Sequence, residues 1–198
     1  GTVLRLTNAN AIQDSALVMS PNSSLSSTLQ LRSNSSVAFT ATGLSLARFT
    51  DVIDVGPSSG TASSDVTLTV GGPVSFSNAG ILNVTSPASA NGHYTLAIGA
   101  GAFSNATFTF SPSTASLTIA SLTAAGTSGT ASYHFNGSGN TTVTGGITDG
   151  SGTAKSAVYL DAGNTGTVTL EGTSGYTNAT TINAGTLALS RGGSIADS

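Results

Sequence analysis

The chain has 198 residues but only five basic and eight acidic side chains, which give a net charge of −3. Four Arg and one Lys are too few to neutralise a row of phosphates, so we expect no nucleic-acid partner. No apolar run approaches the ~20 residues of a membrane-spanning helix, and the lack of Cys excludes disulfides and thiolate metal sites. Because 38% of the residues are hydrophobic, the chain should still fold around a core.

Short strands are predicted along the whole chain, because apolar residues alternate with Thr or Ser at a period of two. In chain order, the clearest runs are 66–70, 94–98, 107–110, 117–119, 167–170 and 187–189. Turn clusters separate them, for example at 56–60, 71–73 and 136–140. Glu, Lys, Gln and Met together number five, and no long segment has a helical period. The chain is therefore all-β, and composition alone leaves a sandwich, a barrel and a solenoid open.

The two ends of the chain resemble each other. Residues 1–6 match 185–189 with one inserted residue, and 12–15 match 195–198. A fixed period is the mark of a repeat protein. This match predicts a repeat of about 184 residues, in which the two end segments would occupy equivalent positions.

Residues 166–187 read GTVTLEGTSGYTNATTINAGTL and resemble the autotransporter-associated β-strand repeat, also called the passenger-associated transport repeat. Residues 144–152 look like the segment that leads into this repeat, and 1–15 look like the one that follows it. Three departures are small: Val168 replaces an inward Leu, Glu171 replaces an outward Ser, and Asn178 replaces a Gly. Asn tolerates left-handed backbone best after Gly.

This resemblance implies a right-handed parallel β-helix. We expect one solenoid segment over 1–198, with family-like parts at 1–48 and 144–198 and a divergent middle at 49–143, where a β-sandwich is the alternative. Gly and Asn would form the corners, where a positive φ is needed. Four side chains are expected to be buried in the core: Leu170, Ile182, Leu187 and Leu189. Thr167 and Thr169 should face outward.

No catalytic, cofactor or metal site is predicted. Asp51 and Asp54 belong to the densest group of charges, but their odd spacing places them on opposite faces of a strand, and we expect them to cap or end it. His134 should point outward between inward Tyr133 and Phe135, and a zinc site that used His93 and His134 would need a third ligand from the few Asp residues. Asp14 and Asp197 each precede a Ser at matching repeat positions and should cap a turn. Three further acidic residues neighbour turns and have no acidic partner within three residues, so no calcium loop is expected there: Asp65, Asp149 and Asp161.

Seven Asn residues lie in sequons that could be glycosylated: Asn22, Asn34, Asn83, Asn105, Asn136, Asn140 and Asn178. Because Ser and Thr number 63, several of these sequons are expected by chance.

These features predict a non-catalytic structural segment of a secreted or surface-exposed bacterial repeat protein that builds an elongated fibre or passenger stalk. Neither end shows a polar cap, so the expected partner is the chain itself, stacked head to tail, or adjacent repeats of a longer polypeptide. The alternative is an adhesin module for glycans or a host surface. A polysaccharide-active β-helix enzyme is a third, weaker hypothesis.

Overall fold

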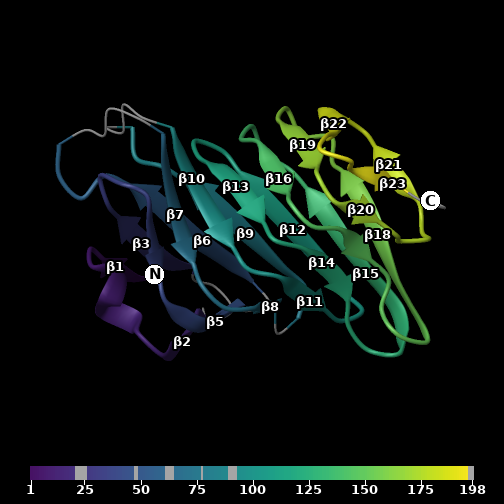
Figure 1. Cartoon of the computed structure of the whole chain (residues 1–198), viewed down its shortest axis with the longest axis horizontal. Helices are drawn as coiled ribbons and strands as arrows, with labels where there is room; N and C mark the ends of the chain where they lie inside the picture. Colours follow the sequence, from purple (N-terminus) through teal and green to yellow (C-terminus); the bar gives the residue numbers. More distant parts are fainter. Residues whose placement is uncertain (21–25, 47–48, 61–64, 77, 89–92, 196–198) are drawn as a thin grey trace.

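The computed structural model describes residues 1–20, 26–46, 49–60, 65–76, 78–88 and 93–195. The strands wind into a right-handed parallel β-helix of about seven turns, which confirms the predicted solenoid. Figure 1 shows the coils following one another along the long axis, from the purple N-terminal end to the yellow C-terminal end. Among the described residues the only helical element is the short 3-10 helix η1 (Ala9–Ile12).

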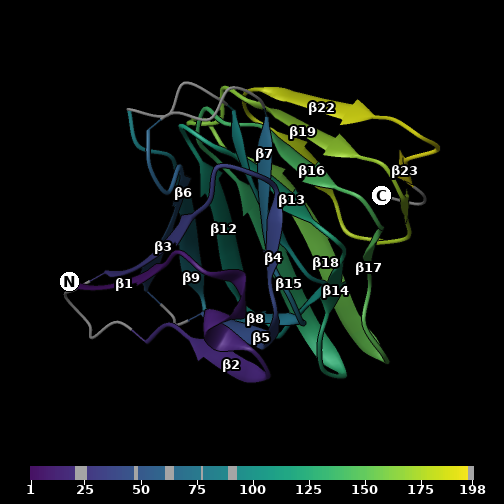
Figure 2. The ribbon, with the colours of Figure 1, turned by 60° about the vertical axis from the view of Figure 1, so that its left-hand side comes forward.

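Successive coils contribute strands to three faces, and the strands within each sheet pair in parallel with those of the adjacent coil (Figure 2). Sheet A contains β1 (Thr2–Leu6), β3 (Ser27–Arg32), β6 (Thr50–Gly56), β9 (Gly80–Thr85), β12 (Thr107–Pro112), β15 (Ser128–Phe135), β18 (Thr153–Leu160) and β21 (Thr180–Ile182). Sheet C contains β4 (Val37–Phe39), β7 (Val66–Val70), β10 (Tyr94–Ile98), β13 (Ser116–Ile119), β16 (Thr141–Val143), β19 (Thr167–Leu170) and β22 (Thr186–Leu189).

Sheet B contains β2 (Ser15–Val18), β5 (Ala41–Leu46), β8 (Val74–Phe76), β11 (Gly101–Phe103), β14 (Leu122–Ala124) and β17 (Ile147–Thr148). The pair β20 (Thr173–Ser174) and β23 (Ser194–Ile195) continues this face through a bridge between Thr148 and Gly175. In the first coil, η1 takes the place of a sheet C strand and contacts β4.

The period-two pattern decides which side chains enter the interior. Leu68, Leu96 and Leu117 lie in register in sheet C, and each is almost completely buried. Phe103 of sheet B and Phe108 of sheet A are also buried and pack against each other across the interior, with ring centroids 4.8 Å apart. Each such side chain stabilises the fold by about 1.5–3 kcal/mol relative to an exposed one. The core therefore depends on rows of like residues that are contributed by successive coils.

Polar side chains at the corners bind the backbone of the adjacent coil. The Asn105 Oδ1 atom accepts the Thr130 N–H at 3.1 Å, and the Asn140 Oδ1 atom accepts the Thr167 N–H at 3.0 Å. Gly137 turns a corner at φ 88°, and a Cβ there would lie 2.1 Å from the Pro112 carbonyl oxygen. Asn178 is not among the described residues with positive φ, so its expected left-handed conformation is wrong. Asn acts at these corners through its amide group rather than through its backbone conformation.

The middle of the chain continues the same solenoid, so the β-sandwich alternative for 49–143 is wrong. Coil length varies there: Ser27 lies opposite Asp51, 24 residues later, whereas Thr50 lies opposite Ile81, 31 residues later. Turns of unequal length hide the period in the sequence while the strands stay in register. The solenoid does not need a fixed repeat length.

The structure does not reproduce two expectations about the ends. Residues 2–6 form β1 in sheet A, whereas 186–189 form β22 in sheet C, so the two matching segments do not occupy equivalent positions. Leu170 is fully buried as predicted and Leu187 is partly buried, but Ile182 and Leu189 are 53% and 50% exposed. Both belong to inward rows, and they are exposed because no described coil covers them.

Candidate functional site

The densest group of charges does not form a catalytic pair. Asp51 and Asp54 lie on opposite faces of β6, as the spacing predicts, with Asp51 fully buried on the inward face. The expectation that they cap or end a strand is wrong, because both lie inside β6. Two carboxylates on opposite sides of one sheet cannot act on the same glycosidic bond.

Asp54 is instead the centre of a polar ladder on the outer face of sheet A. Arg5, Gln30, Asp54 and Thr85 occupy one row in successive coils. The Arg5 Nε atom donates to Gln30 Oε1 at 2.7 Å, and the Thr85 hydroxyl donates to Asp54 Oδ1 at 3.1 Å. Arg32 forms an ion pair with Asp54 and also donates to its carbonyl oxygen at 2.7 Å. These contacts link four coils and satisfy the charge of the carboxylate.

Asp149 connects two successive coils near the C-terminal end through its contact with Thr177. It follows β17 and accepts hydrogen bonds from the Ser156 N–H at 2.7 Å, the Thr177 hydroxyl at 2.7 Å and Lys155 Nζ at 3.1 Å. Burial alone would raise the pKa of Asp149, but the hydrogen bonds from Thr177, Ser156 and Lys155 outweigh it and lower the pKa. A carboxylate held in this way stabilises the fold and has little basicity for catalysis.

His134 and Asp161 form a third polar group, on the outer face of sheet A near the C-terminal end. As predicted, Tyr133 and Phe135 point inward and His134 points outward. Its Nδ1 atom lies 2.8 Å from Asp161 Oδ1, and its ring stacks on Tyr159 at 4.5 Å between centroids. This cluster presents ring edges, a carboxylate and a phenol to the surroundings.

The remaining candidate residues lie apart from one another. His93 and Asp65 are exposed, and Asp14 is exposed in a turn at φ 56°. Asp197 lies outside the described residues. Within the part of the chain that the structure describes, no three His, Cys, Asp or Glu side chains come close enough to hold a metal ion.

Several sequon residues bind other coils. The Asn34 amide nitrogen donates to the Ser59 carbonyl oxygen at 2.7 Å, and the Asn178 amide nitrogen donates to the Thr130 hydroxyl at 3.3 Å. Asn105 and Asn140 accept backbone N–H groups, as described above. Asn83 lies within β9, Asn136 follows β15, and Asn22 lies outside the described residues. Amides used in this way hold coils in register, so a sugar on Asn34 or Asn178 would have to displace a contact between coils.

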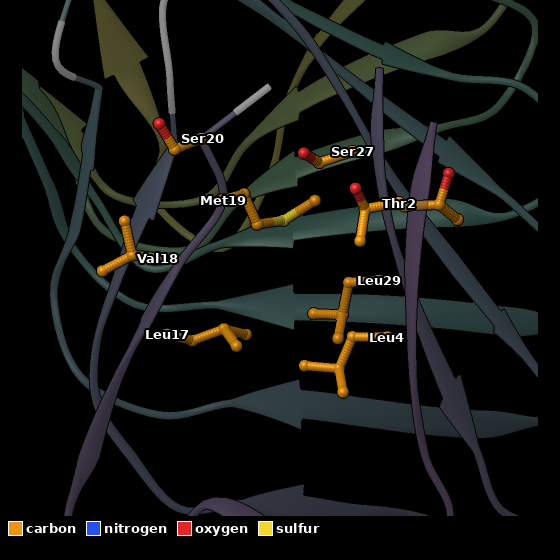
Figure 3. A pocket seen from close by; sticks show the side chains of 9 residues that line it. Thr2, Leu4, Leu17, Val18, Met19, Ser20, Ser27 and Leu29 are labelled. Atoms are coloured by element: carbon orange, nitrogen blue, oxygen red, sulfur yellow. The ribbon is translucent and has the colours of Figure 1, made fainter. Parts of the chain in front are cut away.

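The N-terminal end of the solenoid contains an open apolar groove of about 260 Å³. We call this the N-terminal groove, lined by Thr2, Leu4, Leu17, Val18, Met19, Ser20, Ser27, Thr28 and Leu29. Figure 3 shows Leu17 and Met19 pointing across it toward Leu4 and Leu29, while Val18 points away. Leu4 is 46% exposed although it occupies an inward position, because β1 is the last strand of sheet A at this end.

The opposite end is also apolar. There the C-terminal coil, which consists of β21, β22 and β23, exposes Ile182 and Leu189 along the solenoid axis. Arg191 and Glu171 pair at this end at 3.2 Å, but the Arg191 side chain is 80% exposed, so the pair contributes little stability. The two ends therefore present apolar side chains and strand edges, whereas the described outer faces between them are mainly polar.

No protein-family model, curated protein or solved structure matches this chain. In the described part of the chain, no helix combines the length and the apolar character that crossing a membrane requires. The resemblance to the autotransporter-associated repeat therefore remains a prediction from the quoted residues.

Sequence reasoning missed the contacts between coils, including the pairing of Arg32 with Asp54 and of Asp149 with Thr177. The separation in sequence was the available signal, since these partners lie 22 and 28 residues apart, close to one coil. Because the coils differ in length, the sequence separation alone does not predict which residues of two coils are partners.

Proposed function

We propose that this chain is a non-catalytic structural segment of a secreted or surface-exposed bacterial repeat protein, which builds an elongated fibre or passenger stalk by stacking coils. The observation that supports this proposal most directly is the stack itself: strands on three faces pair in parallel with strands of the adjacent coil along the described chain. A solenoid gains length by adding coils because each coil contacts only its neighbours. The partners are then further coils, either of a longer polypeptide or of other copies.

The polar chemistry supports this proposal. Asp54 is held by Thr85 and Arg32 of adjacent coils. Asp149 is held by Thr177, about one coil further along, and by nearby Lys155. Groups used in this way position the coils and are not aimed at a substrate. The bacterial surface location rests on the resemblance of residues 166–187 to the autotransporter-associated repeat.

Imaging and an activity screen test the proposal together. Electron microscopy of the purified chain should show rods or filaments, and incubation with pectins, alginates and peptidoglycan should release no product. Cleavage that disappears in both Asp54→Asn and Asp51→Asn variants would refute the non-catalytic assignment. An Asp65→Asn variant is the matched control, because Asp65 is exposed and lies outside both polar groups.

A glycan-binding adhesin is the second candidate, favoured by the outward cluster of His134, Tyr159 and Asp161. A phenol edge and a carboxylate can bind sugar hydroxyls, although His134 already covers one face of the Tyr159 ring. Binding to a glycan array that is lost in Tyr159→Ala and kept in Thr109→Ala, a change in the same row, would favour this candidate over the purely structural one.

A further inference from the structure

The outer face of sheet C carries two rows of small uncharged side chains. The first row consists of successive register partners in β7, β10, β13, β16 and β19, namely Thr69, Ala97, Thr118, Thr142 and Thr169. The second row lies two residues earlier in the same strands or just before them and contains Thr67, Thr95, Ser116, Asn140 and Thr167. We call these two rows the Thr face. Figure 1 shows the five strands side by side along the long axis, so the Thr face lies on the side of the solenoid and not at either end.

The hydroxyl groups of the Thr face are available to an external partner. Among the described residues, none of these hydroxyls has a hydrogen bond to another protein group. The other two faces differ: on sheet A the Thr85 hydroxyl donates to Asp54, and on sheet B the Thr123 and Thr148 hydroxyl oxygens lie 3.0 Å apart in a hydrogen bond. Because a β-branched side chain is stiff at χ1, the hydroxyls of the Thr face are also held at regular positions.

The composition of the Thr face argues against the usual macromolecular partners. The five strands contain no charged residue, so the face cannot neutralise phosphates. Trp, Tyr and Arg dominate the binding energy of protein interfaces, but the one aromatic residue of these strands, Tyr94, is buried. The face instead presents hydroxyl and methyl groups at a regular spacing, which suits a partner that is itself a regular array.

The spacing of the rows is close to a repeat of crystalline water. Adjacent strands lie ~4.8 Å apart, so each row repeats at that distance along the solenoid axis. In ice, O–H···O bonds of about 2.75 Å point in tetrahedral directions, so two oxygens that share a neighbour lie about 4.5 Å apart. Centred on β13, the accumulated difference reaches about 0.6 Å at β7 and β19, close to the ~0.5 Å range over which O–H···O distances vary. The hydroxyls of one row can therefore bond to successive molecules of one ordered water layer.

We propose that the Thr face binds ice. The two rows lie about 6.6 Å apart along the strands, so the hydroxyls form a two-dimensional array and not a single line. The Thr methyl groups restrict the orientation of the water beside them, and the hydroxyls bond that layer to the lattice. Each contact is weak, but many contacts act together because the face is rigid. The inference is independent of the proposed structural function, although further coils of the same kind would lengthen the rows.

Slow freezing tests this inference directly. Ice that grows slowly from a dilute solution rejects solutes that do not bind it, so the protein concentrations in the ice and in the remaining liquid report binding. The wild-type chain should enter the ice. Thr118→Tyr and Thr142→Tyr place a ring on the middle of the Thr face and should lower the incorporated fraction several-fold. Thr109→Tyr is the matched control, because Thr109 points outward from sheet A beside His134, and it should enter the ice as the wild type does.

Circular dichroism of each variant verifies that the solenoid is folded before freezing. Rejection of the wild-type chain by the ice would overturn the inference, and so would equal losses in Thr118→Tyr and Thr109→Tyr. Retention on crystalline cellulose or chitin that is lost in Thr118→Tyr, without incorporation of the wild type into ice, would assign the Thr face to a polysaccharide surface instead. Electron microscopy keeps the two proposals apart, because the structural function predicts rods or filaments whether or not the chain enters ice.

Discussion

Leu170 and Leu189 are register partners in adjacent strands of sheet C, yet Leu170 is completely buried and Leu189 is half exposed. The residue type, the sheet and the inward direction are the same. The difference is that β19 has a strand on either side, whereas β22 has a neighbour on one side only. An inward side chain of this fold is therefore buried only where a coil lies on each side of it, and each coil gains its stability from those two neighbours.

The largest expected effect is on that pair of Leu residues. Leu170→Ala should lower the free energy of unfolding by about 2–5 kcal/mol, because it empties a filled core site. Leu189→Ala should cost much less in the dispersed chain, about 1 kcal/mol, because half of that side chain is already in solvent. Urea denaturation followed by circular dichroism measures both changes. Equal losses would show that Leu189 is covered by another part of the chain.

A smaller effect is expected from the carboxylate that connects the C-terminal coils. Asp149→Ala should cost about 1.5–3 kcal/mol, because it leaves the Ser156 and Thr177 N–H groups without their acceptor. Asp65→Ala is the control and should change stability by less than about 0.5 kcal/mol, because Asp65 is exposed. An equal response of the two variants would contradict the role assigned to Asp149.

The pH dependence of the free energy of unfolding tests the role of Asp149 further. The pKa of Asp149 is lowered below its ordinary value of 3.8 in the folded chain, so its carboxylate contributes stability at pH values above that point. This contribution is lost as the pH falls through the lowered pKa. Chemical denaturation between pH 2 and about 6 should show a loss of stability in acid that is smaller in Asp149→Asn. An unchanged acid response in that variant would mean that other carboxylates cause it.

The smallest effect is expected on the outer face of β19. Thr167 and Thr169 alternate with the buried Val168 and Leu170, and their side chains point outward. Thr167→Ala and Thr169→Ala should each change the free energy of unfolding by about 0.5 kcal/mol or less. If either matched the loss from Leu170→Ala in the same denaturation experiment, the assignment of inward and outward faces would be wrong.

Sequence patterning predicted the strands and their inward faces, because the alternation that buries Leu68 and turns Thr67 outward is local and can be read in five residues. The choice of a solenoid came from the resemblance of residues 166–187 to a repeat family. The patterning did not predict that Ile182 is exposed, since the same alternation holds whether or not a coil follows. The sequence also did not predict the ion pair between Arg32 and Asp54. That contact depends on the coil length, which varies from 24 to 31 residues in this half of the chain. The strands follow from local alternation, whereas polar contacts such as Arg32–Asp54 and Asp149–Thr177 follow from the register between coils.

The direction of the hydrogen bonds has a mechanical consequence. Bonds between successive coils, such as those joining β15 to β18, run along the long axis of the molecule. Tension between the two ends would pull along these hydrogen bonds, so they would break coil by coil and not all at once as under shear. Each coil rises only ~4.8 Å along the axis, but the 25 residues that separate Thr2 from Ser27 would extend to about 85 Å. A stalk built from such coils would yield under load by lengthening one coil at a time, and the coils that remain stacked would keep their core.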